Sequence, residues 1–174
     1  MTSSDAPTGT DRLAEASESL DYEIFLNVQG DEPLVRPADI TRVADRKEQC
    51  PDCVVNAYCY LSYAEDPNSP NIPKIVSTED DTLMYMSRAA LPAYKDVSNA
   101  PDRYKKQVCV YGFNKQELRE FRRFARKSRV EACEDIEILR FFDLGRKIVL
   151  VEVSPGSLAV DVPEDVAPVV AALE

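Results

Sequence analysis

The chain has 174 residues, of which 44% are apolar and 30% charged, and it carries a formal net charge of -10. That size and composition fit one globular domain, and so negative a charge argues against binding duplex nucleic acid, which needs a basic face. No apolar run approaches the ~18 residues of a membrane span, and the first ten residues lack the features of a signal peptide. The sequence therefore predicts a soluble, cytoplasmic protein without a nucleic-acid or membrane partner.

Five cysteines, an odd number, favour reduced thiols over a disulfide framework. Cys50 and Cys53 form an isolated CPDC motif. It could be redox-active or half of a zinc site, but two thiols around a proline turn are the simpler interpretation. The sequence contains no histidine, which excludes Ser-His-Asp and Cys-His hydrolases. Any acid–base chemistry must use carboxylates, tyrosine, lysine or metal-bound water.

Helical and extended patterns alternate along the first part of the chain. A short helix is expected at residues 10–18, and the apolar run EIFLNVQ follows it as a buried strand. The segment RPADITRVADRKEQ has helical periodicity, and CVVNAYCYL after it is rich in β-forming residues. This strand–helix–strand order predicts a parallel crossover.

The second part of the chain continues the alternation after a small hairpin. KIVST and TLMYMS flank an acidic turn and predict that hairpin. QVCVYGF is expected as a strand, and Asn114 with Glu117 three residues later predicts a capping box for the next helix. A further helix ending at Gly145, a strand and a terminal helix complete the pattern. The order predicts an α/β fold with a mainly parallel sheet and helices on both faces.

The turn QGDEP, directly after the first strand, places polar side chains where such sheets bind ligands. Open α/β sheets bind at the carboxyl ends of their strands. Asp161 lies between the last strand and the last helix, so Asp31 and Asp161 could converge although they are far apart in sequence. The alternatives are a turn residue for Asp31 and a helix cap for Asp161.

Six blocks of the sequence resemble the 3-deoxy-manno-octulosonate (Kdo) cytidylyltransferases in their order and spacing. The blocks are DAPTGTDRLAEA, NVQGDEPLVRPADI, YMSRAALP, VYGFNKQEL, VEACEDIEILR and VDVPEDV. The resemblance implies a Rossmann-like nucleotidyltransferase fold, commonly a homodimer, that uses magnesium to join CTP and a sugar acid into a CMP-sugar with release of pyrophosphate. It makes Asp31 and Asp161 the metal ligands, which suits the preference of Mg²⁺ for carboxylates.

The resemblance also places a nucleotide contact near the start of the chain. Gly9, Thr10 and Arg12 match the block that contacts the cytosine and ribose, with Asp31 on the metal beside the nucleotide. A small residue there would admit the base, and a backbone amide would read its edge. The alternative is an ordinary helix start.

The acceptor pocket is implied by five further positions. Arg88, also a predicted catalytic residue, and Gln29 match this pocket, and the planar guanidinium of Arg88 suits a carboxylate. Tyr111, Glu137 and Gln107 match pocket positions as well. The alternatives are a surface charge for Arg88, a core aromatic for Tyr111 and a solvated helix face for Glu137.

Three departures from the family pattern bear on the acceptor. Gln107 replaces a histidine, Ile138 a glutamine and Val162 a threonine. Each change removes a polar group expected on the acceptor side, and loss of such groups usually reports a different ligand. The open alternatives are a cytidylyltransferase for a phosphonate or another acidic acceptor, and a noncatalytic nucleotide-binding module.

The beginning of the sequence also differs from the family pattern. The family opens with a strand and a basic, glycine-containing phosphate loop, and residues 1–174 correspond to about the C-terminal two thirds of a single family domain. We expect a central strand and the phosphate-holding loop to be missing from this stretch. Expressed alone, it should be prone to aggregation and show no appreciable CMP-sugar synthesis.

Overall fold

The computed structural model describes residues 2–160 and 162–173. The helices and strands, in chain order, are α1 (Gly9–Glu18), β1 (Ile24–Val28), α2 (Pro37–Gln49), β2 (Val54–Tyr60), β3 (Lys74–Ser77), β4 (Leu83–Ser87), β5 (Lys105–Asn114), α3 (Lys115–Phe124), α4 (Arg129–Glu134), α5 (Arg140–Asp143), β6 (Ile148–Glu152) and α6 (Val166–Leu173). Short 3₁₀ turns lie at Val97–Asn99, Glu137–Leu139 and Pro163–Asp165. No helix in the described part of the chain is long and apolar enough to cross a membrane.

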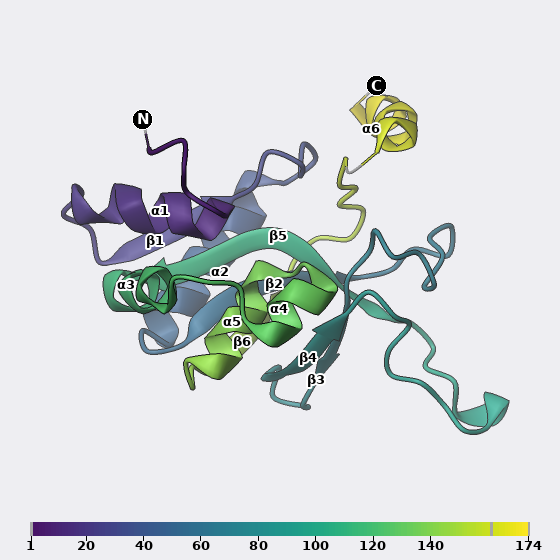
Figure 1. The fold of residues 1–174 in the computed structure, drawn as a ribbon. Helices are drawn as coiled ribbons and strands as arrows, with labels where there is room; N and C mark the ends of the chain where they lie inside the picture. The colour runs from purple at the N-terminus through teal and green to yellow at the C-terminus, as the bar shows by residue number, and fades with distance from the viewer. Residues whose placement is uncertain (1, 161, 174) are drawn as a thin grey trace.

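All six strands belong to one sheet, in the order β4-β3-β5-β2-β6, with β1 added beside β5 (Figure 1). The long strand β5 organises this sheet. β2 covers one of its edges, while β1 pairs with residues 110–114 and β3 with residues 105 and 106 of the other edge. The two strands on that edge therefore separate around residues 107–109.

The prediction of a mainly parallel sheet is wrong for this chain. Among the described strands, only β2 and β6 pair in parallel. β1 and β2 do run in the same direction, as the predicted crossover requires, but β5 lies between them and is antiparallel to both. Hydrophobic periodicity reports burial and not the pairing partner, so it could not show that a strand from much later in the chain is inserted there.

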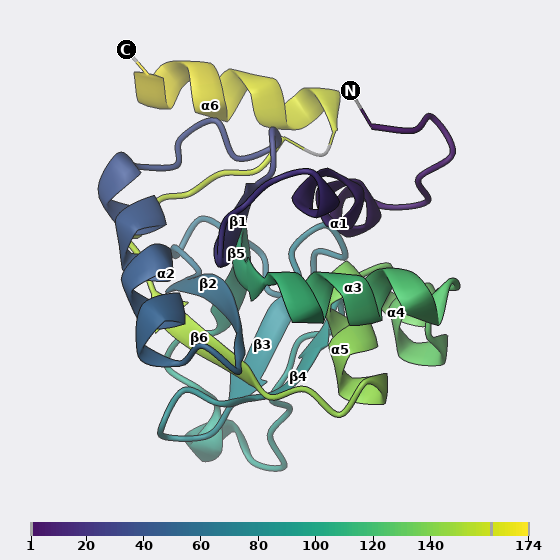
Figure 2. The ribbon, with the colours of Figure 1, turned by 90° about the vertical axis from the view of Figure 1, so that its left-hand side faces the viewer.

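Two apolar clusters cover the two faces of the sheet, as the α/β prediction required. On one face α1 and α3 lie side by side (Figure 2), and Leu118, Phe121 and Phe141 belong to the buried cluster beneath them. On the other face α2 contributes Val43 to a second cluster with residues of β2, β5 and β6. The α/β class is thus confirmed, with helices on both faces of a mixed sheet.

Most of the predicted local elements are present, but one predicted helix is split into shorter elements. The β3–β4 hairpin is confirmed, and so is the capping box in which Asn114 and Glu117 exchange hydrogen bonds at the start of α3. The helix predicted to end at Gly145 is instead split, because α4 ends at Glu134 and the next residue, Asp135, lies in the left-handed region with φ 51°. The chain after that break forms a 3₁₀ turn and then α5.

The expectation of reduced thiols is wrong for the CPDC motif. A disulfide joins Cys50 and Cys53, whose Cα atoms are 5.4 Å apart. The tight turn after α2, in which Cys53 N donates to Cys50 O, brings the two side chains together.

Candidate functional site

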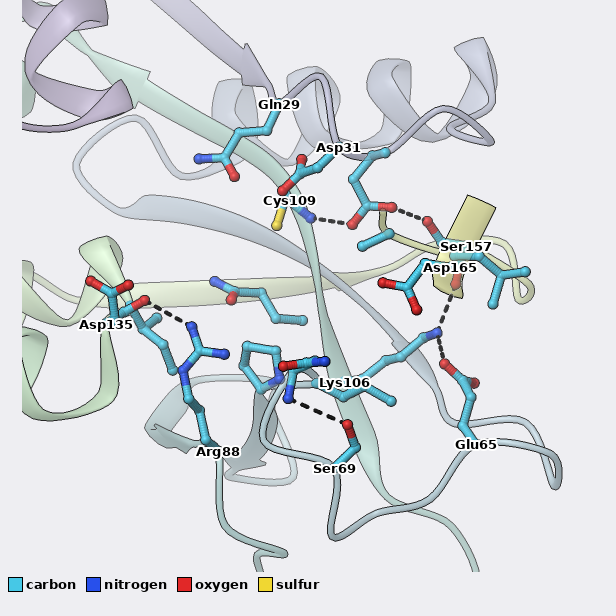
Figure 3. A pocket seen from close by; sticks show the side chains of 18 of the residues that line it. Gln29, Asp31, Glu65, Ser69, Arg88, Lys106, Cys109, Asp135, Ser157 and Asp165 are labelled. Atoms are coloured by element: carbon cyan, nitrogen blue, oxygen red, sulfur yellow. Dashed lines mark hydrogen bonds and ion pairs between the residues drawn. The ribbon is translucent and has the colours of Figure 1, made fainter. Parts of the chain in front are cut away.

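A cavity of ≈ 310 Å³ lies where β1 and β3 separate along the edge of β5. Gln29 N, after β1, donates to Cys109 O (3.1 Å), and Gln107 N donates to Pro73 O, before β3 (3.0 Å). Figure 3 shows the side chains that gather there. Successive side chains of a strand point to opposite faces, yet both Lys106 and Gln107 line the cavity. The cavity therefore reaches both faces of the sheet at this gap.

The cavity lining is rich in charge. Its described carboxylates are Asp31, Glu32, Glu65, Asp135, Glu137 and Asp165, and its described cations are Arg88 and Lys106. The predicted acceptor residues Gln29, Arg88, Gln107, Tyr111 and Glu137 all line it, together with Asp31. Six predicted site residues are thus brought together, and their roles in binding stay predictions.

Asp31 is placed at the cavity with one carboxylate oxygen left without a partner. Its Oδ1 is buried and accepts no hydrogen bond within the described part of the chain. Burial raises the pKa of Asp31 above its usual value, because the charged form is poorly solvated there. Val160 N donates to Asp31 O (2.9 Å), which fixes the segment after β6 against the QGDEP turn. Asp161, the predicted second ligand and alternative helix cap, lies outside the described residues.

Glu32 anchors the same turn to two other parts of the chain. Its side chain is buried and accepts hydrogen bonds from Cys109 N (2.9 Å) in β5 and from the Ser157 hydroxyl after β6. Burial raises the pKa of Glu32, the neighbouring Asp31 charge adds to this effect, and the Ser157 hydrogen bond opposes it. Glu32 therefore sets the position of the turn, while Asp31 is left facing the cavity.

The guanidinium of Arg88 joins two walls of the cavity. It donates to the backbone oxygens of Pro70 (2.6 Å), Asp135 (3.1 Å) and Glu134. Figure 3 shows the side chain reaching toward Asp135. All three acceptors are neutral carbonyls, so these bonds orient the guanidinium without neutralising its charge. The interpretation of Arg88 as a plain surface charge does not fit these contacts.

Glu137 connects the predicted nucleotide and acceptor residues. Its carboxylate accepts hydrogen bonds from Gly9 N (3.2 Å), Thr10 N (2.9 Å) and the Thr10 hydroxyl (2.6 Å). An added Cβ at Gly9 would lie 3.7 Å from Gln29 Nε2. The start of α1 is therefore held at the cavity edge by a carboxylate, as favoured at a helix N-terminus.

Tyr111 and Gln107 form a hydrogen-bonded pair on the cavity floor. Gln107 Nε2 donates to the Tyr111 hydroxyl (3.1 Å), and both residues are buried. Burial raises the pKa of Tyr111 well above its usual value, so the phenol stays protonated. Tyr111 also stacks on Phe113, which makes it a core aromatic and a cavity residue at once.

Arg12 and Ile138 are not among the residues that line the cavity. Arg12 is exposed, and its guanidinium donates to Ser3 O (2.9 Å). Ile138 is 2% exposed and packs in the core, so the loss of the family's glutamine there adds an apolar core residue. Val162 belongs to the turn before α6, where its N–H donates to the Asp165 carboxylate (3.0 Å).

The sequence did not assign four residues that hold this site together. They are Glu32, Glu65, Lys106 and Ser157. Glu32 is visible in the QGDEP turn as a second acid. The roles of the other three depend on contacts between distant segments, for which the sequence carries no local signal.

The fold is that of sugar-nucleotide-forming nucleotidyltransferases. A CMP:2-keto-3-deoxy-manno-octonic acid synthetase, solved as a complex with CTP, matches with a TM-score of 0.87 and 30% identity, covering 99% of this chain and 70% of that one. A putative glucose-1-phosphate thymidylyltransferase from Bacillus anthracis shares only the fold, with a TM-score of 0.64 and 11% identity over 99% of this chain and 63% of its own.

The sequence comparisons identify the family. The cytidylyltransferase family model matches residues 1–148. The 3-deoxy-manno-octulosonate cytidylyltransferase of Geobacter sulfurreducens is 35% identical over all of this chain and 73% of its own length, and that of Christiangramia forsetii is 36% identical over 90% of this chain and 64% of its own. The chain belongs to the cytidylyltransferase family. It spans about two thirds of the length of these relatives.

Proposed function

We propose that this chain carries the acceptor and metal side of a CTP-dependent cytidylyltransferase that transfers CMP to Kdo or a related sugar acid. The observation that carries the proposal is the Asp31 carboxylate, which lines a cavity built from the predicted acceptor residues and has one buried oxygen without a hydrogen-bond partner among the described residues. The relatives named Kdo cytidylyltransferases and the CTP complex of the similar structure support the choice of substrates.

In the proposed reaction a hydroxyl of the acceptor attacks the α-phosphorus of CTP, and the bond to the bridging oxygen of pyrophosphate breaks. Positioning and charge stabilisation dominate catalysis of such transfers. Glu137 would hold Gly9 and Thr10 against the nucleotide, while Arg88 would direct its charge at the acceptor carboxylate. Tyr111, kept protonated by burial, would donate a hydrogen bond to the acceptor.

The residues present fit a magnesium ion. A buried carboxylate oxygen without a hydrogen bond is the donor type that hard Mg²⁺ selects, and one or two carboxylates normally suffice because phosphate oxygens and water supply the rest. Asp31 would hold the ion with Asp161, and the ion would neutralise the triphosphate.

A homodimer in the cytoplasm is part of the same proposal.

The test is pyrophosphate release from CTP, Mg²⁺ and Kdo by the purified protein. We expect turnover that Asp31→Asn reduces at least a hundredfold, since a charged ligand is lost while side-chain volume is kept. Asp45→Asn is the matched control, because Asp45 is exposed on α2, outside the cavity lining. Turnover that Asp31→Asn leaves unchanged would contradict the assignment.

A second candidate is the same chemistry on a different acidic acceptor. Gln107, where the resembling family has histidine, lies in the cavity and bonds Tyr111, so the departure alters the floor of the site. A panel of sugar acids and phosphonates, assayed with CTP, distinguishes the two candidates by their kcat/KM. Binding of CTP without turnover of any acceptor would favour the noncatalytic module.

A further inference from the structure

Two buried lysines face each other across β3 and β5. Lys74 and Lys106 are register partners in this antiparallel pair, so their side chains share one face of the sheet. Both residues are buried, and like charges placed directly opposite each other destabilise a sheet. The pairing therefore requires compensating contacts for each ammonium group.

Lys74 is compensated by backbone carbonyls, with a smaller contribution from the charges of Asp66 and Glu134. Its Nζ donates to Ser69 O (2.7 Å) and Arg88 O (2.5 Å), and it does not belong to the cavity lining. Burial lowers the pKa of Lys74, and the nearby charge of Arg88 adds to this effect. These contacts tie the loop before β3 to the end of β4, which is a structural role.

Lys106 has a different environment, because it lines the cavity. Its Nζ donates to the Glu65 carboxylate and to Ser157 O (2.7 Å), and its side chain is 7% exposed (Figure 3). An ammonium group carries three N–H donors, whereas Lys106 has two acceptors, the Glu65 carboxylate and Ser157 O, in the described part of the chain. A cation with donor capacity therefore stands beside the cavity, hydrogen-bonded to the Glu65 carboxylate and within electrostatic reach of Glu32.

Glu65 comes from the loop 61–73, which forms one wall of the cavity. Glu65, Ser69, Asn71, Ile72 and Pro73 of this loop line it. The second oxygen of Glu65 caps its own turn by accepting from Ser62 N (2.8 Å). The loop thus presents a carboxylate to Lys106 at a place where an anionic group of a substrate would also meet the ammonium group.

We propose that Lys106 binds an anionic oxygen of a substrate, either a phosphate of the nucleotide or the carboxylate of the acceptor, and that Glu65 competes for the same ammonium group. The proposal rests on the proposed function for the choice of substrates. It has a consequence that a structural ion pair does not share. Removing the lysine charge should weaken substrate binding, whereas removing the glutamate charge should strengthen it.

The experiment measures the Kd of CTP with Mg²⁺ and the Kd of Kdo separately by calorimetry. Lys106→Met should raise the Kd of one of them about tenfold or more, as expected for loss of a charge-assisted hydrogen bond. Glu65→Gln should lower the Kd of that same ligand, by about threefold or more. The ligand that responds shows whether the anion is phosphate or carboxylate.

Lys105 and Asp81 provide the matched control. Lys105 is the neighbour of Lys106 in β5, its side chain leaves on the opposite face, and it pairs with Asp81 at 2.7 Å outside the cavity lining. Lys105→Met removes one positive charge and Asp81→Asn one negative charge, as the Lys106 and Glu65 variants do. Both control variants should keep the Kd of CTP and the Kd of Kdo within about twofold of the wild-type values. Thermal unfolding of each variant shows that it is folded. Glu65→Gln, which removes no buried cation, tests the proposal even if Lys106→Met fails to fold.

Two results would overturn the inference. Weaker binding in both Lys106→Met and Glu65→Gln would mean that the ion pair only holds the loop 61–73 in place. Unchanged binding of both ligands in both variants would mean that Lys106 does not bind a substrate anion. These outcomes are separate from the proposed function. If the protein releases pyrophosphate but Lys106→Met and Glu65→Gln change the Kd in the same direction, the proposed function stands and this inference is rejected. If the two variants change the Kd in opposite directions but the protein shows no turnover, this inference stands and the proposed function is rejected.

Discussion

Replacing Asp31 with Asn should affect protein stability and metal binding in opposite directions. The side chain keeps its volume and loses the charge of a half-buried carboxylate, one oxygen of which has no hydrogen-bond partner among the described residues. Burial raises the pKa of Asp31, so the ionised carboxylate is less favourable in the folded state than in the unfolded chain at neutral pH. We expect Asp31→Asn to leave the free energy of unfolding equal or to raise it by on the order of 1 kcal/mol, which is about 2–4 °C in Tm.

The same pKa shift gives this effect a pH dependence. A carboxyl group whose pKa is higher in the folded state binds its proton more tightly there than in the unfolded chain. The wild-type protein therefore loses stability as pH rises from the unfolded pKa to the folded pKa, and the variant does not. The difference in Tm between variant and wild type should be small below the unfolded pKa of the aspartate and should grow as the pH rises through the folded pKa.

Magnesium should reverse the order of stability. An ion that binds only the folded state stabilises it by mass action, so Mg²⁺ with CTP should raise the Tm of the wild type and of Asp45→Asn. It should have little effect on Asp31→Asn. Calorimetric melting with and without Mg²⁺ measures all three proteins. An Asp31→Asn variant that keeps the Mg²⁺ effect, or that loses more than about 1 kcal/mol of stability, would refute the account of Asp31 as a partnerless metal ligand.

Three further predictions concern charged and packed positions. Arg88→Lys should raise the KM for the acceptor far more than the KM for CTP, because one ammonium nitrogen cannot replace the three separate nitrogens of the planar guanidinium, which orient its charge; equal effects in steady-state kinetics would place Arg88 on the nucleotide side. Lys47→Met should cost about 3–5 kcal/mol in urea unfolding, since it leaves the fully buried Glu117 without the ammonium group 2.7 Å away, and adding Glu117→Gln should recover part of that loss; a single variant as stable as the wild type would contradict this. Gly112→Ala should also lower the urea midpoint, because its Cβ would lie 3.2 Å from the Lys47 Cβ, and an unchanged midpoint would show that α2 can shift.

Local signals in the sequence determined most of the elements and the polar character of the QGDEP turn. The capping box at Asn114 and Glu117, the β3–β4 hairpin and the alternation of strands and helices each depend on residues a few positions apart. Such patterns reflect backbone capping and side-chain periodicity, which are properties of a single segment. The six blocks that resemble the family indicated the family itself, because they preserve order and spacing, and the proposed substrates follow from that resemblance.

Tertiary structure decided where those elements meet. The insertion of β5 between β1 and β2, and the gap it creates at residues 107–109, arise from pairings between distant segments that periodicity cannot specify. The bonds from Glu137 to Gly9 and Thr10 span 128 and 127 residues, and the pairing of Lys106 with Glu65 spans 41. Each of these contacts forms only once the sheet is assembled, because the sheet brings the partners within hydrogen-bond distance.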